Sequence, residues 1–286
     1  MESEQLSCLG GSKCRGGEAR GKGGAGRWGR AEPVTVGRRH LSDVRRQIST
    51  FQPPRSSAVP QPATSAAPIP TPPPTTATRY LYLARHGDAG HEGPVLSDAG
   101  RRQAGLLGRR LTGVPWDVVY HGPLGRAAET ARLVAAELDG VVPREAEWAG
   151  DYVPYWPERA ELPAAQADGM LGFLGDPEPE EREAGPRLAR EAAVHCTGPV
   201  DGPDPRHELV ITHSFLIGWL VRAALDAPDW RWIGLNPGNA ALTVIRYAPE
   251  RPASVLLLND MAHLPAELKW TGFPKQYADE FGAYAV

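Results

Sequence analysis

The sequence predicts an α/β protein with a three-layer α/β/α arrangement and a mostly parallel central sheet. Two observations carry this prediction. Short apolar runs alternate with amphipathic helical patterns along residues 79–247. Two of the runs, residues 79–84 and 208–212, end abruptly in polar side chains, as buried strands do at the ligand-binding edge of such a sheet.

The folded part is expected to begin near residue 78. Residues 1–50 contain ten Lys and Arg against five Asp and Glu, and residues 52–77 consist largely of Pro, Ala, Ser and Thr. Such compositions bury too little apolar surface to offset the entropy lost on ordering. We therefore predict that residues 1–77 are disordered and that residues 78–286 form a single domain. The basic segment is interpreted as solvated, rather than as an arm for nucleic acid or anionic lipid.

No stretch of the sequence suits a membrane or a secretory route. We find neither an apolar run of 18 residues nor an apolar leader near Met1. The three cysteines, Cys8, Cys14 and Cys196, are too few and too scattered for a disulfide framework. These observations favour a cytoplasmic protein with no membrane and no nucleic acid partner. They do not predict the oligomeric state.

The first polar cluster is Arg85-His86-Gly87-Asp88, which directly follows the apolar run 79–84. A guanidinium offers a planar fork to phosphate oxygens, and an imidazole acts as a nucleophile or a base near neutral pH. The pair therefore suits chemistry on an anion. It becomes a strong signal if a second His, a second Arg and a carboxylate follow later in the chain.

A helix, a strand and a second helix come next. Ser97 is placed to cap a helix that runs to about residue 111, and residues 117–120 have the β-branched character of a strand. The second helix is predicted over residues 124–138, with Arg126 in its first turn. Unpaired backbone N–H groups at a helix start form an anion site, so Arg126 is a candidate binding residue.

The second half of the chain repeats the pattern of strand and polar end. The apolar run 208–212 ends in His213-Ser214, and a helix that is apolar on nearly all sides follows. The other elements are predicted from periodicity and breakers: a strand at 141–147, an irregular loop at 148–163, helices at 171–174 and 185–196 separated by an acidic segment at 176–183, a helix at 215–225, and antiparallel strands at 240–247 and 254–258.

Strand ends in a parallel sheet meet at one edge, so the polar clusters should converge. Two guanidinium groups, from Arg85 and Arg126, would meet two imidazoles, from His86 and His213. Such a cavity selects anions, and a phosphoryl group is its natural ligand because positive groups stabilise the charge on the transferring oxygens.

Four motifs, in order, resemble the histidine phosphatase superfamily, also called phosphoglycerate-mutase-like. Residues 83–87 (LARHG) are similar to its RHG signature, and residues 96–104 (LSDAGRRQA) to its LS-x-x-G-x-x-QA helix start. Residues 122–131 (GPLGRAAETA) resemble its S-P-L-x-RA-x-x-TA element, and residues 210–214 (VITHS) its second-histidine strand. The resemblance covers residues 79 to about 260 and implies a phosphoglycerate-mutase-like fold, with residues 78–286 as the catalytic domain.

The resemblance also implies an activity. It predicts a phosphatase that hydrolyses a phosphate monoester through a phosphohistidine intermediate on His86, without a cofactor or a metal. Arg85, Arg126 and His213 would hold the phosphoryl oxygens and stabilise the transition state. Three further positions are assigned to substrate binding: Gly87, Asp88 and Ser214.

The general acid has more than one candidate. A carboxylic acid must protonate the leaving oxygen and then, once ionised, activate water. The family places a Glu after the third strand and near a Gly; here Glu147 precedes Gly150 and Asp151 follows it. We favour Asp151, because the turn after Gly150 would direct it toward the strand ends. Glu147 is the alternative, and Asp88 ranks behind both.

Rival interpretations keep the pocket but change its use. A mutase of the same fold would need a closed pocket, and a regulatory module would bind phosphate without turnover. A metal hydrolase would use His86, Asp88, His91 and His213, a spacing that matches no common zinc pattern. The substrate is predicted to be a small phosphorylated molecule whose identity is set by the insertion at 148–183. The chain departs from the family motif at His121-Gly122, where a Ser is usual.

Overall fold

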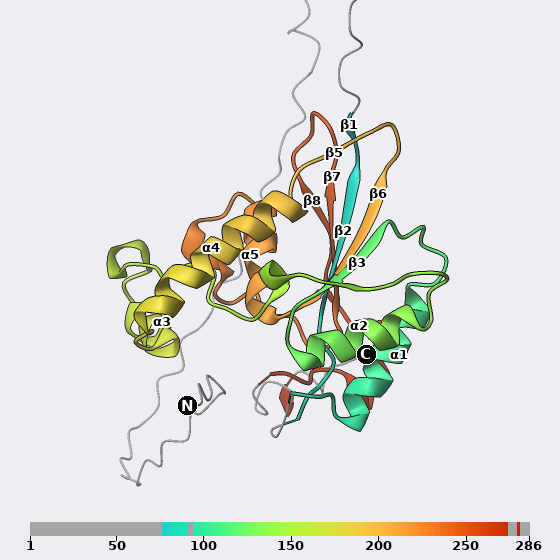
Figure 1. Cartoon of the computed structure of the whole chain (residues 1–286). Helices are drawn as coiled ribbons and strands as arrows, with labels where there is room; N and C mark the ends of the chain where they lie inside the picture. Colours follow the sequence, from blue (N-terminus) through green and yellow to red (C-terminus); the bar gives the residue numbers. More distant parts are fainter. Residues whose placement is uncertain (1–75, 91–93, 274–278, 281–286) are drawn as a thin grey trace, which may run out of the picture. The chain divides into compact units, whose positions relative to one another are not determined.

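The structure, a computed structural model, describes residues 76–90, 94–273 and 279–280. All of these residues belong to one unit of the chain, Pro68–Val286. A six-stranded sheet in the order β4-β3-β6-β2-β7-β8 forms its centre (Figure 1). The strands are β2 (Arg79–Arg85), β3 (Val118–His121), β4 (Arg144–Glu145), β6 (Arg206–Thr212), β7 (Leu242–Tyr247) and β8 (Ser254–Asp260).

The sheet is mostly parallel, as predicted. Strand β2 runs parallel to β6, β6 to β3, and β3 to β4, whereas β7 and β8 are antiparallel to their neighbours. The predicted antiparallel pair near the C-terminus is therefore confirmed. The register pairs Arg85 at the end of β2 with Thr212 at the end of β6. The residues that follow these two strands consequently leave the sheet at the same level.

Helices cover both faces of the sheet, which gives the predicted three layers. Leu81 and Leu83 of β2 face one core with α5 (Ser214–Ala224) and α4 (Pro179–Cys196), whereas Ala84 faces the other core with α1 (Asp98–Arg110) and α2 (Gly125–Ala135). Figure 1 shows α4 and α5 on one side of the strands and α1 and α2 on the other. Alternate residues of one strand thus feed two separate cores.

Ser97 begins α1 as predicted, because its hydroxyl oxygen accepts a hydrogen bond from the Gly100 N–H at 3.0 Å. Helix α4 differs from the prediction, since it starts at Pro179, inside the acidic segment that was expected to separate two helices. Pro is favoured in the first turn of a helix, and Glu180 and Glu181 there complement the helix dipole. The acidic segment is thus largely a helix start.

Three other boundaries were displaced. The third strand is reduced to the exposed pair Arg144–Glu145, and α3 spans Ala167–Leu174, longer than the predicted turn of helix. Thr76 and Ala77, predicted to precede the folded part, form strand β1, which pairs with β5 (Val200–Asp201). The rest of the segment predicted to be disordered, residues 1–75, lies outside the described residues.

The prediction that an aromatic tail at 270–284 folds over the body is only partly covered, because residues 274–278 and 281–286 lie outside the described residues. None of the helices among the described residues combines the length and the apolar character that a membrane span requires.

Candidate active site

Two histidines meet at the carboxyl ends of neighbouring parallel strands. His86 directly follows β2 and His213 directly follows β6. Their ring centroids are 5.0 Å apart and their ring planes are inclined at 55°. Both side chains are buried, with residue exposures of 6% and 1%. The matched register of the two strands is what places the two imidazoles side by side.

The hydrogen bonds of His86 fix the tautomer of its ring. Its Nδ1 lies 2.7 Å from the carbonyl oxygen of Gly87, and its Nε2 lies 3.2 Å from Nε of Arg126. A guanidinium only donates hydrogen bonds, so Nε2 is the acceptor and Nδ1 carries the hydrogen that it donates to Gly87. Burial, followed by the electrostatic influence of His213 and Arg85, holds the pKa of His86 well below its usual value.

The main chain around His86 is held on both sides. The His86 N–H donates to the Thr212 carbonyl at 2.9 Å. The His86 carbonyl accepts from the side-chain amide of Asn239 at 3.0 Å and from the Ala240 N–H at 3.2 Å. The Gly87 N–H donates to the hydroxyl of the fully buried Thr130 at 3.0 Å. The nucleophile candidate therefore sits on a peptide whose polar groups are all paired.

Arg126 and Asp151 form an ion pair beside the histidines. Arg126 lies in the first turn of α2, and its Nη2 donates to Oδ2 of Asp151 at 2.7 Å. The same carboxylate oxygen lies 3.5 Å from Nδ1 of His213. The acid favoured from the sequence thus contacts two of the predicted binding residues.

His213 is buried, and neither of its ring nitrogens has a hydrogen-bond partner among the described residues. Burial, followed by the charges of Arg126 and Arg85, keeps the pKa of His213 well below its usual value. At neutral pH the ring is uncharged, so its approach to Asp151 is not an ion pair. An unsatisfied buried imidazole in such a place is free to bond an incoming ligand oxygen.

The Arg85 guanidinium is hydrogen-bonded to the segment before β7 and to the turn at Gly272. Its Nη1 donates to the carbonyl oxygens of Pro237 at 3.1 Å and Gly272 at 3.0 Å. Gly272 has a φ of +81°, and a Cβ built on it would lie 2.5 Å from Nη1 of Arg85. The guanidinium is therefore confined by the backbone around it. Its charge lowers the pKa of both histidines.

The other residues predicted for the site make different contacts. Glu147 begins the short helix η1 (Glu147–Ala149) and is exposed. The Asp88 carboxylate accepts a hydrogen bond from the Ser97 hydroxyl at 2.6 Å, so it supports the start of α1, and its assignment to substrate binding stays a prediction. Gly87 contributes its backbone carbonyl, which accepts from His86. Ser214 begins α5, and its hydroxyl lies 3.5 Å from the side-chain oxygen of Asn236.

Sequence reasoning missed Asn239 and gave Thr130 no role. Thr130 belongs to the motif at residues 122–131, so its spacing from Arg126 was a usable signal. Its hydroxyl donates to the Arg126 carbonyl at 2.7 Å while it accepts from Gly87. Asn239 carries no comparable local signal, because its partner, the His86 carbonyl, is distant in the chain.

The interpretation as a metal hydrolase was compared with the positions of the candidate ligands among the described residues. Within residues 76–90, 94–273 and 279–280, no group of three His, Cys, Asp or Glu side chains is placed to hold a metal ion. His91, which that interpretation used, lies outside the described residues.

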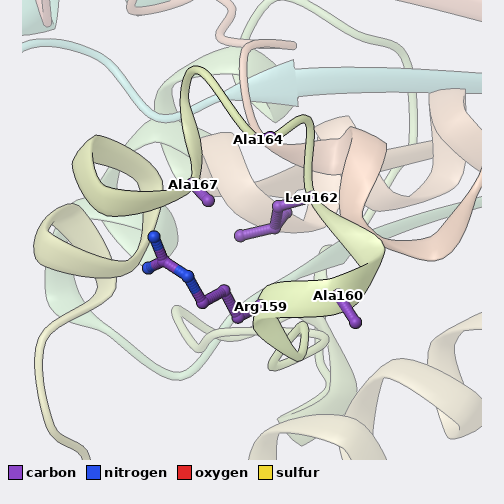
Figure 2. A pocket seen from close by; sticks show the side chains of 5 residues that line it. All are labelled: Arg159, Ala160, Leu162, Ala164 and Ala167. Carbon is purple, nitrogen blue, oxygen red and sulfur yellow. The ribbon is translucent and has the colours of Figure 1, made fainter.

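A pocket of about 420 Å³ lies in the insertion that was predicted to set specificity. Figure 2 shows its lining side chains around the turn before α3. Arg159 among them donates to Asp168 of α3 at 2.5 Å. None of the residues predicted for catalysis lines this pocket, which consists of Arg159, Ala160, Leu162, Ala164 and Ala167.

Comparison with known proteins identifies a family whose model matches most of the residues that form the central sheet. Residues 81–260 match the model of the histidine phosphatase superfamily (branch 1). This range begins within β2 and ends with β8, so it includes both histidines, both arginines and Asp151.

Curated relatives carry phosphatase names. One is the serine/threonine-protein phosphatase Pgam5, mitochondrial, of Caenorhabditis elegans, which is 31% identical over 195 residues. The match covers 66% of this chain and 66% of that relative, slightly less than two thirds of its length. Another is the Xenopus laevis protein of the same name, 28% identical over 202 residues, with 67% of this chain and 68% of the relative covered.

Solved structures with similar folds include enzymes of phosphate esters. A phosphoglycerate mutase from Plasmodium falciparum has a TM-score of 0.45 and 18% identity, with 66% of this chain and 95% of that chain covered. The alpha-ribazole phosphatase from Shigella flexneri has a TM-score of 0.46 and 19% identity, with 63% and 96% covered.

The predicted cytoplasmic location is wrong on this comparison, because the relatives are named mitochondrial phosphatases. A low cysteine count argues only against a disulfide-rich secreted protein. Such evidence does not distinguish among the remaining compartments of the cell, which is why the sequence argument failed at this point.

Proposed function

The chain belongs to the histidine phosphatase superfamily, and from that premise we propose that it hydrolyses phosphate monoesters through a phosphohistidine on His86, without a metal. One observation carries the proposal. The Nδ1–H of His86 is committed to the Gly87 carbonyl, and its unprotonated Nε2 points at the guanidinium of Arg126. A neutral imidazole so oriented is a nucleophile aimed at an anion-binding group.

In the first step, Nε2 of His86 attacks phosphorus as the bond to the leaving oxygen breaks. The phosphoryl oxygens spread negative charge, and the guanidinium groups of Arg85 and Arg126 stabilise it. His213 supplies a further hydrogen bond, because its ring nitrogens have no partner among the described residues. These groups provide the charge stabilisation that a metal provides in other phosphatases.

Asp151 serves as the acid and then as the base in this proposal. A phosphoryl group that binds Arg126 competes with the Asp151 carboxylate for the same guanidinium. The displaced carboxylate takes up a proton from solvent, and Asp151 then gives this proton to the leaving alkoxide. The resulting carboxylate removes a proton from water, whose oxygen attacks phosphorus while the Nε2–P bond breaks. Alcohol and inorganic phosphate leave, His86 is a neutral imidazole again, and Asp151 releases its proton to solvent as it re-forms the ion pair with Arg126.

The relatives' names suggest a substrate class. They are named serine/threonine-protein phosphatases, so phosphoserine and phosphothreonine in proteins are candidates for this chain as well. A small phosphorylated molecule is the alternative. A panel of phosphopeptides and phosphorylated metabolites, compared by kcat/KM, separates the two classes.

The proposal is tested with His86→Ala and an aryl phosphate in the presence of a chelator. We expect phosphate release by the wild type, a 32P-labelled, acid-labile and alkali-stable phosphoenzyme, and the loss of both in His86→Ala. His207→Ala is the matched control, because His207 lies near the start of β6, at the opposite end of the strand that His213 follows. Undiminished turnover in His86→Ala would reject the nucleophile, and loss of wild-type activity with the chelator would reject metal independence.

A further inference from the structure

We propose that His263 and Arg110 are positioning residues, which act on His86 through the turn at Asn239-Ala240. The proposal rests on the proposed function, since it concerns how the nucleophile of that reaction is held. Neither side chain contacts His86. Each hydrogen bond on the path from Arg110 to the His86 backbone is present in the structure.

The turn at Asn239-Ala240 is hydrogen-bonded to the main chain at the end of β2. The Ala240 N–H donates to the carbonyls of both Arg85, at 3.0 Å, and His86, at 3.2 Å. The Asn239 amide donates to the same His86 carbonyl at 3.0 Å. Both turn residues are buried. The position of the peptide that carries the nucleophile therefore depends on the position of this turn.

The turn is held in a conformation that Ala does not favour by itself. Ala240 has a φ of +52°, in the left-handed region, where a residue with a Cβ is strained by about 1 kcal/mol or more. Such a conformation persists only when surrounding contacts over-determine it. His263 supplies one of these contacts, because its Nε2 lies 3.1 Å from the Ala240 carbonyl oxygen.

Arg110 fixes which nitrogen of His263 carries the hydrogen. The Arg110 Nη1 lies 3.0 Å from Nδ1 of His263. Since a guanidinium only donates, Nδ1 accepts and Nε2–H is left to donate to Ala240. Burial and the charge of Arg110 lower the pKa of His263 to about 4, so the ring stays neutral at physiological pH.

Asp260 locks Arg110 in this orientation. The two terminal nitrogens of Arg110 donate to the two carboxylate oxygens of Asp260 at 2.9 and 2.8 Å. The hydrogen bond to Arg110 lowers the pKa of Asp260 to about 2, so the carboxylate is ionised over the working range of pH. The last residue of α1 and the last residue of β8 are thus joined, and both support the turn before β7.

The test compares His263→Ala and His263→Asn with His263→Gln. A Gln side chain has an amide N–H near the place of Nε2 and an oxygen to accept from Arg110, whereas Asn is too short to reach Ala240. Arg110→Gln removes the group that sets the tautomer. Arg102→Gln is the matched control, because Arg102 lies on the same helix in an exposed ion pair with Glu267.

Two measurements are made on each folded variant. Rapid-quench kinetics with an aryl phosphate gives the rate constant and the amplitude of phosphohistidine formation. We expect His263→Ala and Arg110→Gln to lower the rate constant about 10- to 100-fold with unchanged amplitude, and His263→Gln to stay within about threefold of the wild type. 15N NMR of the ring should show His86 losing its single Nδ1–H tautomer in the same variants.

The outcomes separate positioning from simple stabilisation. Should His263→Ala lower Tm and amplitude while the rate constant and the His86 tautomer stay as in the wild type, the two residues are structural only. Should His263→Ala fail to fold, His263→Asn and Arg110→Gln decide by the same criteria. If the wild type forms no phosphohistidine, the proposed function fails, and the NMR result alone decides: an altered His86 tautomer upholds the positioning, and an unaltered one rejects it.

Discussion

The imidazole of His86 lies 5.0 Å from that of His213, centroid to centroid, and the pKa of each ring is well below its usual value, although the Asp151 carboxylate lies 3.5 Å from Nδ1 of His213. The two strands that they follow are paired in parallel, with Arg85 level with Thr212. Burial, two nearby guanidinium groups and the mutual approach of the rings all disfavour protonation. The fold therefore maintains two neutral imidazoles in a strongly cationic place.

The lowered pKa values predict acid sensitivity. In the unfolded chain both histidines titrate near pH 6.5, and in the folded protein both pKa values are lower. Between these values the unfolded chain binds more protons, so the free energy of unfolding decreases as the pH falls below about 6.5, by at most about 1.4 kcal/mol per pH unit for each histidine. His213→Gln should flatten the decline in Tm between pH 7.5 and 5. Equal slopes in both proteins would contradict the prediction.

Arg126 is expected to be irreplaceable by Lys. Its Nε contacts His86 and its Nη2 contacts Asp151, and a single ammonium does not reproduce both directions. Arg126→Lys should lower kcat/KM for an aryl phosphate about 100-fold, a loss of about 2.7 kcal/mol in transition-state stabilisation. Arg132→Lys, on an exposed position of the same helix, should have no effect. Similar losses in both variants would show a general helix effect instead.

The dependence of the rate on the leaving group distinguishes Asp151 from Glu147 as the general acid. Asp151 contacts Arg126 and approaches His213, whereas Glu147 is exposed at the start of η1. Asp151→Asn should slow an alkyl phosphate about 100-fold or more and a nitrophenyl phosphate much less, because a good leaving group needs no proton. Glu147→Gln should leave both substrates unaffected. A leaving-group dependence in Glu147→Gln and none in Asp151→Asn would reverse the assignment.

The sequence predicts those parts of the site that local pattern controls. An apolar strand that ends in Arg85-His86, and another that ends in His213, are visible because the chain changes character within a few residues. The parallel sheet follows from the alternation of such strands with helices. The start of α4 was missed because Pro179 and its acidic neighbours were taken for a break, although they suit the first turn of a helix.

Long-range contacts account for what the sequence did not predict. Asn239 matters through the His86 carbonyl, and His263 through the Ala240 carbonyl, and each pair is formed only when distant segments pack together. The contact between the Asp88 carboxylate and the Ser97 hydroxyl was not predicted for the same reason, since nothing local indicates it. Position in a motif indicates a site, and the fold decides which polar atoms face it.

Thr130 supports both the nucleophile and the arginine. Its buried hydroxyl accepts from the Gly87 N–H and donates to the Arg126 carbonyl. Thr130→Val keeps the shape but leaves the buried Gly87 N–H unpaired, which should destabilise the protein by about 1–3 kcal/mol and lower kcat. Thr130→Ser retains the hydroxyl and should keep most of the activity. Denaturant unfolding and steady-state kinetics on the pair test this, and a Ser variant as impaired as Val would refute it.

Gly272→Ala tests the confinement of the Arg85 guanidinium. Gly272 and Gly113 both have left-handed φ values, +81° and +84°, so an Ala should strain both backbones similarly. A Cβ on Gly272 would lie 2.4 Å from Oδ1 of Asn239 and 2.5 Å from Nη1 of Arg85, whereas a Cβ on Gly113 has no atom within 4 Å. Both variants should lose about 1 kcal/mol of stability from backbone strain, and Gly272→Ala should lose more because of these close contacts. Only Gly272→Ala should weaken inhibition by inorganic phosphate or vanadate, about tenfold, since only there must a phosphate-binding group move. Equal inhibition constants for the two variants, measured at a temperature where both are folded, would mean that Arg85 is not held for phosphate by this turn.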